Sequence, residues 1–137
     1  MDRDFVRHAA MGGTAEVELG RLAQRQGASR DVRNFGAMMV RDHSRANAEL
    51  MRMAMRLRVA APATMGPDER SDMMRLRRLR GRDFDREYKR MMVADHQKDI
   101  MEFQDEARNG RGPIAEFARK TLPTLREHLR MAQAMRP

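Results

Sequence analysis

Apolar side chains recur every three or four residues along most of this chain, which is the period of an α-helix. Glycine, proline and polar residues interrupt the pattern near residue 27, over 59–66, near residue 81 and over 109–113. No segment alternates apolar and polar residues in the manner of a strand. The pattern predicts an all-α chain with long helices at about 4–27, 30–57, 84–108 and 113–135 and a short helix at about 67–80.

Each long helix carries a single apolar stripe, as the members of a four-helix bundle do. Short turns join the first two helices and the last two, so each pair should be antiparallel. The connection over 58–83 is long enough to cross the whole bundle, and it contains the short helix. Helices 30–57 and 84–108 should therefore run parallel on a diagonal, as in a ferritin-like four-helix bundle with a long crossover. We expect one domain over 1–137.

Helices 30–57 and 84–108 also resemble each other in sequence. When 33–54 is aligned with 86–107, eight of the 22 positions are identical, and both segments contain Met-Met-Val-x-Asp-His. Helices rich in methionine and arginine can resemble each other by composition alone. The shared motif nevertheless favours a duplication or a paired functional role.

Four polar side chains occupy stripe positions where a core residue is expected. Glu16, His43 and His96 lie near the midpoints of their helices, and His128 lies about one turn past the midpoint of the last. All four should therefore meet in one layer in the middle of the bundle. Such a layer needs internal partners, because a lone buried carboxylate costs several kcal/mol or becomes neutral.

Two arrangements would satisfy this layer, and the sequence leaves both open. A Zn, Cu or Fe ion could be bound by three imidazoles and one carboxylate, which complete a four-coordinate shell. Alternatively, a hydrogen-bonded His–Glu network could fix the register of the helices without metal. A third alternative is that the four side chains do not converge.

Asp42 and Asp95 directly precede two of these histidines and lie about 100° around their helices. From there each carboxylate could accept a hydrogen bond from a histidine of a neighbouring helix and so orient a metal ligand. The alternative is that both are surface acids that pair with arginine.

The sequence does not favour an enzyme. A di-iron centre needs Glu-x-x-His motifs, but Val40, Val93 and Leu125 stand three residues before the histidines. The chain has no cysteine, which excludes thiolate metal sites, disulfides and a cysteine nucleophile. No nucleophile–base pair or cofactor-binding loop is visible, so we assign no catalytic residue.

The chain is basic, with a formal net charge of +8, and its densest basic stretch is 75–82. No aromatic stacking platform accompanies this stretch, and elsewhere arginine alternates with Asp and Glu as on a solvated helix face. We expect no specific nucleic-acid partner, and any DNA binding should be weak and steeply salt-dependent. The 15 methionines could supply thioether ligands for Cu(I), but they are better explained as core filler.

Gly12 and Gly13 lie one turn before Glu16, inside the first helix. Each costs about 1 kcal/mol there relative to alanine. Either a neighbouring helix packs closely at this point, or space is left beside the polar layer.

Four segments together resemble the domain-of-unknown-function 4142 family: FVRHAAMGGTAEVELGRLA, NFGAMMVRDHSRANAEL, FDREYKRMMVADHQKDIMEF and FARKTLPTLREHLRMA. The resemblance covers nearly the whole chain. It implies a ferritin-like four-helix bundle from bacteria, with no established biochemical activity. The family's polar motif positions match Glu16, Asp42-His43, Asp95-His96 and His128.

The resemblance also implies export to the periplasm or cell envelope, because family members commonly carry a signal peptide. Here the start, Met1-Asp2-Arg3-Asp4, has no apolar signal region, so a trimmed signal or a cytoplasmic location would both fit. The sequence contains no run of about 18 apolar residues, so it predicts no transmembrane segment. We expect a metal-binding bundle used for storage, buffering or sensing, or else a structural or stress-related bundle; the sequence does not specify the oligomeric state.

Overall fold

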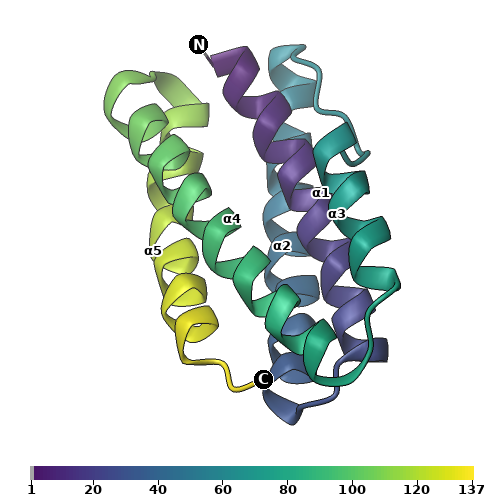
Figure 1. Cartoon of the computed structure of the whole chain (residues 1–137). Helices are drawn as coiled ribbons and strands as arrows, with labels where there is room; N and C mark the ends of the chain where they lie inside the picture. Colours follow the sequence, from purple (N-terminus) through teal and green to yellow (C-terminus); the bar gives the residue numbers. More distant parts are fainter. Residues whose placement is uncertain (1) are drawn as a thin grey trace.

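The structure, a computed structural model, describes residues 2–137 and is built from helices alone over that range (Figure 1). The all-α prediction is therefore confirmed. Its five helices are α1 (Asp2–Gln26), α2 (Arg30–Leu57), α3 (Pro67–Arg77), α4 (Gly81–Asn109) and α5 (Gly112–Ala134). Within residues 2–137, no helix is both long and apolar enough to cross a membrane.

The four long helices form a bundle, and α3 packs on its outside against α1 and α4 (Figure 1). The chain descends α1, returns along α2, crosses back through α3, ascends α4 and descends α5. Helices α1 and α5 each contact both α2 and α4, whereas α2 and α4 run parallel and face each other across a diagonal. This is the connectivity expected from the long crossover; the narrower label of ferritin-like stays a prediction.

Two helix ends differ from the sequence expectation. The crossover helix ends at Arg77, and α4 begins at Gly81 with Arg80 as its N-cap, so Asp83 does not cap it. The reason is the conformation of Gly81, whose φ of 59° lets the chain turn sharply into α4. The sequence alone places this glycine at the end of the preceding helix, because left-handed glycines are common there.

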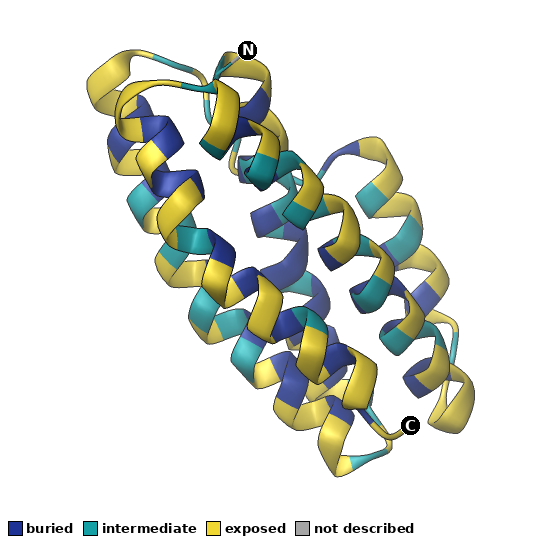
Figure 2. Ribbon diagram, turned by 90° about the vertical axis from the view of Figure 1, so that its left-hand side faces the viewer, coloured by how far each residue is buried: buried dark blue, intermediate teal, exposed yellow. Residues whose placement is uncertain are grey.

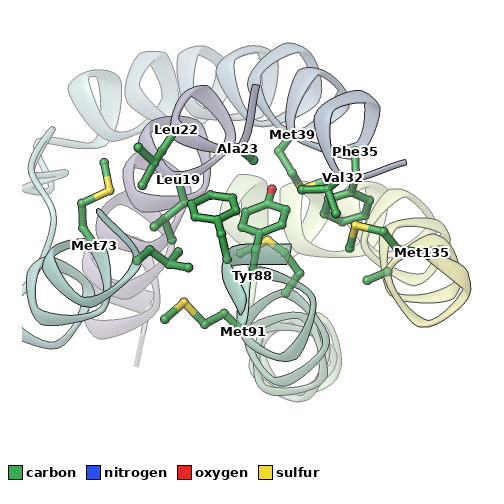
Figure 3. Close-up of a cluster of buried hydrophobic side chains, with 14 of the residues drawn as sticks. Leu19, Leu22, Ala23, Val32, Phe35, Met39, Met73, Tyr88, Met91 and Met135 are labelled. Atoms are coloured by element: carbon green, nitrogen blue, oxygen red, sulfur yellow. The ribbon is translucent and has the colours of Figure 1, made fainter. Parts of the chain in front are cut away.

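Buried residues line the inner faces of the helices and form two apolar clusters (Figure 2). The Tyr88 cluster, drawn in Figure 3, is built from Ala15, Leu19, Leu22, Ala23, Val32, Phe35, Met39, Met73, Leu76, Phe84, Tyr88, Met91, Met92, Ala132 and Met135. The Phe103 cluster is built from Phe5, Val6, Ala10, Leu50, Met53, Ala54, Phe103, Ile114, Phe117, Ala118, Leu122 and Leu125. The core is therefore interrupted near its middle.

Helices α1 and α2 approach each other most closely at Gly20 and Gly36. A Cβ atom built on Gly20 would lie 2.7 Å from the backbone oxygen of Gly36, and one on Gly36 would lie 2.6 Å from the oxygen of Gly20. Gly12 is different, because a Cβ there would meet nothing within 4 Å. Gly13 faces the side chain of Asn47. The double glycine therefore combines both sequence alternatives, open space at Gly12 and close packing at Gly13.

Alanine substitutions at Gly12 and Gly20 should change stability in opposite directions. Gly12→Ala should raise the free energy of unfolding by up to about 1 kcal/mol, because it reduces the entropy of the unfolded chain and meets no steric obstacle. Gly20→Ala should lower it by about 2 kcal/mol, because two backbones must move apart. Urea denaturation of both variants would measure this, and destabilisation by Gly12→Ala would contradict the open space.

Asp85 ties the first turn of the bundle to α4, and its side chain is only 1% exposed. Its Oδ1 accepts a hydrogen bond from the amide of Ala28 at 2.9 Å, and its Oδ2 accepts one from the amide of Ser29 at 2.8 Å. Ser29 in turn caps α2, because its Oγ accepts from the amide of Val32. The sequence predicts the Ser29 cap, whereas only the structure reveals the role of Asp85.

Asp85→Ala should lower the free energy of unfolding by about 2 kcal/mol, because two amides lose a charged acceptor. Asp83→Ala is a matched control in the same helical turn, on an exposed side chain, and should cost less than about 1 kcal/mol. Equal losses in the two variants, measured by denaturant titration, would refute the assigned role of Asp85.

Candidate metal centre

Three histidines from three helices occupy the gap between the two apolar clusters. On α2, His43 lies between Met39 of the Tyr88 cluster and Leu50 of the Phe103 cluster. On α4, His96 lies between Met92 of the Tyr88 cluster and Phe103 of the Phe103 cluster. On α5, His128 lies between Leu125 of the Phe103 cluster and Ala132 of the Tyr88 cluster. Their exposed fractions are 7%, 0% and 1% respectively. The helical period that puts leucine or methionine inward elsewhere puts an imidazole inward at these positions.

The three imidazoles lie together. Each offers one ring nitrogen, and these nitrogens lie within 4.8 Å of one another. The ring centroids of His43 and His128 are 5.2 Å apart, those of His96 and His128 are 5.4 Å apart, and those of His43 and His96 are 5.8 Å apart. Helices that are far apart in sequence thus bring three nitrogen donors to one point.

Two of the rings are oriented by hydrogen bonds that leave their other nitrogen free. His96 Nδ1 lies 2.8 Å from the carbonyl oxygen of Met92, to which it donates. His128 Nε2 lies 2.8 Å from Oδ2 of Asp42 and donates to that carboxylate. The remaining nitrogens, His96 Nε2 and His128 Nδ1, have no hydrogen-bond partner among the described residues, and neither has His43 Nε2. Buried polar atoms without partners are costly and uncommon, so these three require an explanation.

Burial keeps all three imidazoles in the neutral form that can bind metal. Burial, reinforced by the neighbouring His96 and His128, lowers the pKa of His43 well below its ordinary value. Burial and His128 lower the pKa of His96 to about 4. Burial also lowers the pKa of His128, although its hydrogen bond to Asp42 opposes the shift. At neutral pH the site therefore has lone pairs available and no proton to displace.

Asp42 has the position that its place before His43 predicted. It accepts from His128 on the neighbouring helix and also from the guanidinium of Arg41, 2.9 Å away. Partial burial opposes ionisation, but these two hydrogen bonds lower the pKa of Asp42 below its ordinary value. It is therefore an anionic acceptor that fixes the ring of His128.

Asp95 and Glu16 lie elsewhere than the sequence predicted. No hydrogen bond joins Asp95 to a histidine among the described residues; its carboxyl instead lines a cavity with Glu16 and Asp99. Glu16 is 2% exposed, and its Oε2 lies 3.8 Å from His96 Nδ1, the nitrogen already bonded to Met92. The predicted layer of four thus consists of three converging imidazoles with a carboxyl group beside them.

A small cavity reaches His43 from the side of Gly12. Its volume is about 30 Å³, enough for one or two water molecules. Gly12 and Gly13 of α1 line it together with Asn47, and Asp99 of α4 also faces it. The space that Gly12 leaves therefore gives His43 room for a water molecule beside it.

Comparison with known proteins places the chain in a family and a fold. The family described as "Domain of unknown function (DUF4142)" matches residues 1–135, whereas no curated protein matches the sequence. Among solved structures, a DUF305 fragment from Deinococcus radiodurans is similar with a TM-score of 0.84 and 16% identity, over 97% of this chain and 93% of that one. CopM is similar in its Cu(I)-bound form (TM-score 0.78, 15% identity, 98% and 94% covered) and its Cu(II)-bound form (0.79, 15%, 97% and 93%). At these identities the likeness shows the helical bundle alone.

Proposed function

The chain belongs to the DUF4142 family, and we propose that it binds one transition-metal ion, copper in the first place, through His43, His96 and His128. One observation carries the proposal: three buried imidazoles converge from three helices, and each has a ring nitrogen without a partner. In a purely structural core such nitrogens are a cost, whereas around a metal each becomes a ligand.

The spacing of the nitrogens is compatible with an ion after a small adjustment. Imidazole nitrogens bind zinc at about 2.0–2.1 Å, so tetrahedral ligands lie about 3.4 Å apart. The nitrogens here lie within 4.8 Å of one another, so a bound ion would draw the rings together by about an ångström. The hydrogen bonds to Met92 and Asp42 keep the correct nitrogens of two rings inward during this movement.

Copper is favoured over other metals by the ligand type and by the structural neighbours. Imidazole suits both copper and zinc, and a given nitrogen site binds Cu(II) more tightly than the other divalent ions of the first transition row. The similar CopM structures are described as Cu(I)-bound and Cu(II)-bound forms. Copper handling also fits the location in the periplasm or cell envelope that we propose from the family resemblance, with storage, buffering or sensing as the role.

The sequence predicts Glu16 as a fourth ligand, but its position in the structure leads us to propose a site without it. Its Oε2 lies at the Nδ1 edge of His96, and this edge is already bonded to Met92. We propose that the three imidazoles alone determine affinity, and that water from the cavity beside Gly12 completes the shell. Glu16→Gln should therefore change copper affinity by less than about tenfold, the lower end of what loss of a supporting contact costs.

The test is a metal titration of protein purified without a histidine tag. Cu(I) affinity would be measured anaerobically by competition with a chromogenic chelator, and Cu(II) and Zn(II) affinities by calorimetry. We expect one copper ion per chain in the wild type and loss of that ion in His43→Ala and His128→Ala. His8→Ala is the matched control, because His8 is the remaining histidine of the chain. It is exposed and lines the cavity beside His43, but it is not one of the three histidines that converge. Undiminished binding in His43→Ala would overturn the site, and tighter binding of zinc would overturn the choice of copper.

A metal-free structural layer is the second candidate, and the hydrogen bonds of His96 and His128 favour it. In that case the imidazoles only fix the register of the helices. A chelator would then leave the stability unchanged, and His43→Leu would be neutral or stabilising, because apolar replacement of buried polar groups often is.

A further inference from the structure

A second cavity, of about 130 Å³, lies between α1, α3 and α4 and is lined mainly by acidic side chains. Within the described chain, Lys98 alone brings a basic group to its wall. Six carboxyl groups line the cavity: Glu16 from α1, Asp68, Glu69 and Asp72 from α3, and Asp95 and Asp99 from α4. Three separate helices thus direct the same chemistry to one place.

Glu16 shows that the cavity is more than a solvated acidic surface. Its side chain is 3% exposed, and its Oε2 has no hydrogen-bond partner among the described residues. An Asp or Glu side chain is rarely buried to this extent unless a cation or a hydrogen-bond donor pairs with its carboxyl group. His96 Nδ1 lies 3.8 Å away and is already engaged with Met92. The other polar group beside Glu16 is the carboxyl of Asp95, which is close enough to share a hydrogen bond with it. The neighbour of the buried Glu16 carboxyl in this cavity is therefore another acid, and a cation there would replace the proton that the two groups share.

Burial also opposes ionisation of a further carboxyl group of the cavity. Burial, followed by the charges of Asp95 and Glu102, raises the pKa of Asp99 to about 8. Asp72 differs from Asp99, since it pairs with Arg75 at 3.3 Å. A cation in the cavity would allow the carboxyl groups of α1 and α4 to ionise together.

We propose that this cavity is a site for a hard divalent cation, bound by the carboxylate oxygens of Glu16, Asp95 and Asp99 and closed by Glu69 of the crossover helix. Carboxylate oxygens are the ligands preferred by Ca²⁺, Mg²⁺ and Mn²⁺, and they are poor ligands for Cu(I). The ion joins α3 to the bundle, and it is separate from the histidine centre in ligand type and in the ions it selects. The proposal does not depend on copper binding by the histidines.

Mn²⁺ is a suitable probe, because the electron paramagnetic resonance signal of the free aqua ion decreases on binding. We expect chelator-treated wild-type protein to bind one Mn²⁺ per chain, and competition with Ca²⁺ and with Mg²⁺ to show which of these ions the site prefers. Glu16→Gln and Asp99→Asn should each weaken binding at least about tenfold. The control Glu18→Gln removes the same charge from an exposed position on α1 that pairs with Arg21, and it should bind as the wild type does.

Two further results separate this site from the histidine centre and from a purely structural cluster. His43→Ala should retain Mn²⁺ binding even though it loses copper, whereas Glu16→Gln should bind Mn²⁺ more weakly and still bind copper. Without any cation and near pH 8, Asp99→Asn should be more stable than the wild type although it binds Mn²⁺ less well, because asparagine has no carboxyl group whose ionisation burial opposes. Absence of saturable Mn²⁺ binding, or equal binding by the wild type and the two cavity variants, would overturn the proposal.

Discussion

Saturating copper should raise the free energy of unfolding of the wild-type chain by about 4 kcal/mol when the free metal is about a thousandfold above Kd. The increment arises because the folded chain alone brings the three imidazoles within 4.8 Å of one another. His43→Ala should remove this metal-dependent increment while the chain without metal stays helical. Denaturant titration with and without metal, followed by circular dichroism, would measure both quantities.

The copper-dependent gain in the free energy of unfolding should persist to lower pH than the ordinary pKa of histidine suggests. From sequence alone, binding is expected to weaken below about pH 6.5, where free imidazole takes up a proton. In the folded chain, burial lowers the pKa of His43, His96 and His128, that of His96 to about 4. Copper should therefore still bind near pH 5.5, and binding that is lost already at pH 6.5 would contradict the buried, neutral state of the triad.

Acid should nevertheless destabilise the metal-free chain through His96. Its folded-state pKa of about 4 lies below the unfolded value, so between about pH 6.5 and 4 the unfolded chain binds more protons. The stability contributed by the neutral ring is present above pH 6.5 and is lost as the pH falls through this window. Copper shifts that loss to lower pH, because the bound metal excludes the proton from the same nitrogen.

The sequence was sufficient for the bundle and for the triad because both depend on helical period. His43, His96 and His128 stand where the apolar stripe of each helix requires an inward side chain. The short turns set paired helices at matching heights along the bundle axis. The contact of Asp42 follows from the same geometry. Asp42 directly precedes His43, so its side chain points towards the neighbouring helix, where it accepts a hydrogen bond from His128. These features are local in origin and need only the bundle topology to come together.

The acidic cavity could not be predicted in the same way. Asp95 and Asp99 are four residues apart on one face of α4, which is a visible signal, but Glu69 comes from the crossover helix. Where α3 lies depends on the packing of Met73 and Leu76 into the Tyr88 cluster, and no period in the sequence encodes it. Asp85 was missed for the same reason, because its partners are amides of a turn far away in sequence.

Asp99→Asn should stabilise the cation-free chain by about 3 kcal/mol near pH 8, and the gain should shrink towards zero near pH 4. Burial raises the folded-state pKa of Asp99 to about 8, well above the unfolded value. For a carboxyl group whose pKa is raised by folding, the favourable contribution is complete below the unfolded pKa of about 3.9 and is lost as the pH rises to about 8. Each tenfold difference in the acid dissociation constant of Asp99 between the folded and unfolded states corresponds to about 1.4 kcal/mol of stability. We expect roughly half of the stabilisation that the whole pKa difference would give, because the side chain is only partly buried.

The asparagine has nearly the same shape and cannot ionise, so the variant escapes this loss. The measurement is the free energy of unfolding of both chains in urea from pH 4 to pH 9, with chelator present. Mn²⁺ or Ca²⁺ should then narrow the difference at pH 8, because the cation stabilises the wild-type carboxylate and has a weaker site in the variant. A gain that does not depend on pH would show that Asp99 is not held in its protonated form, and a gain unaffected by cation would count against its role as a ligand.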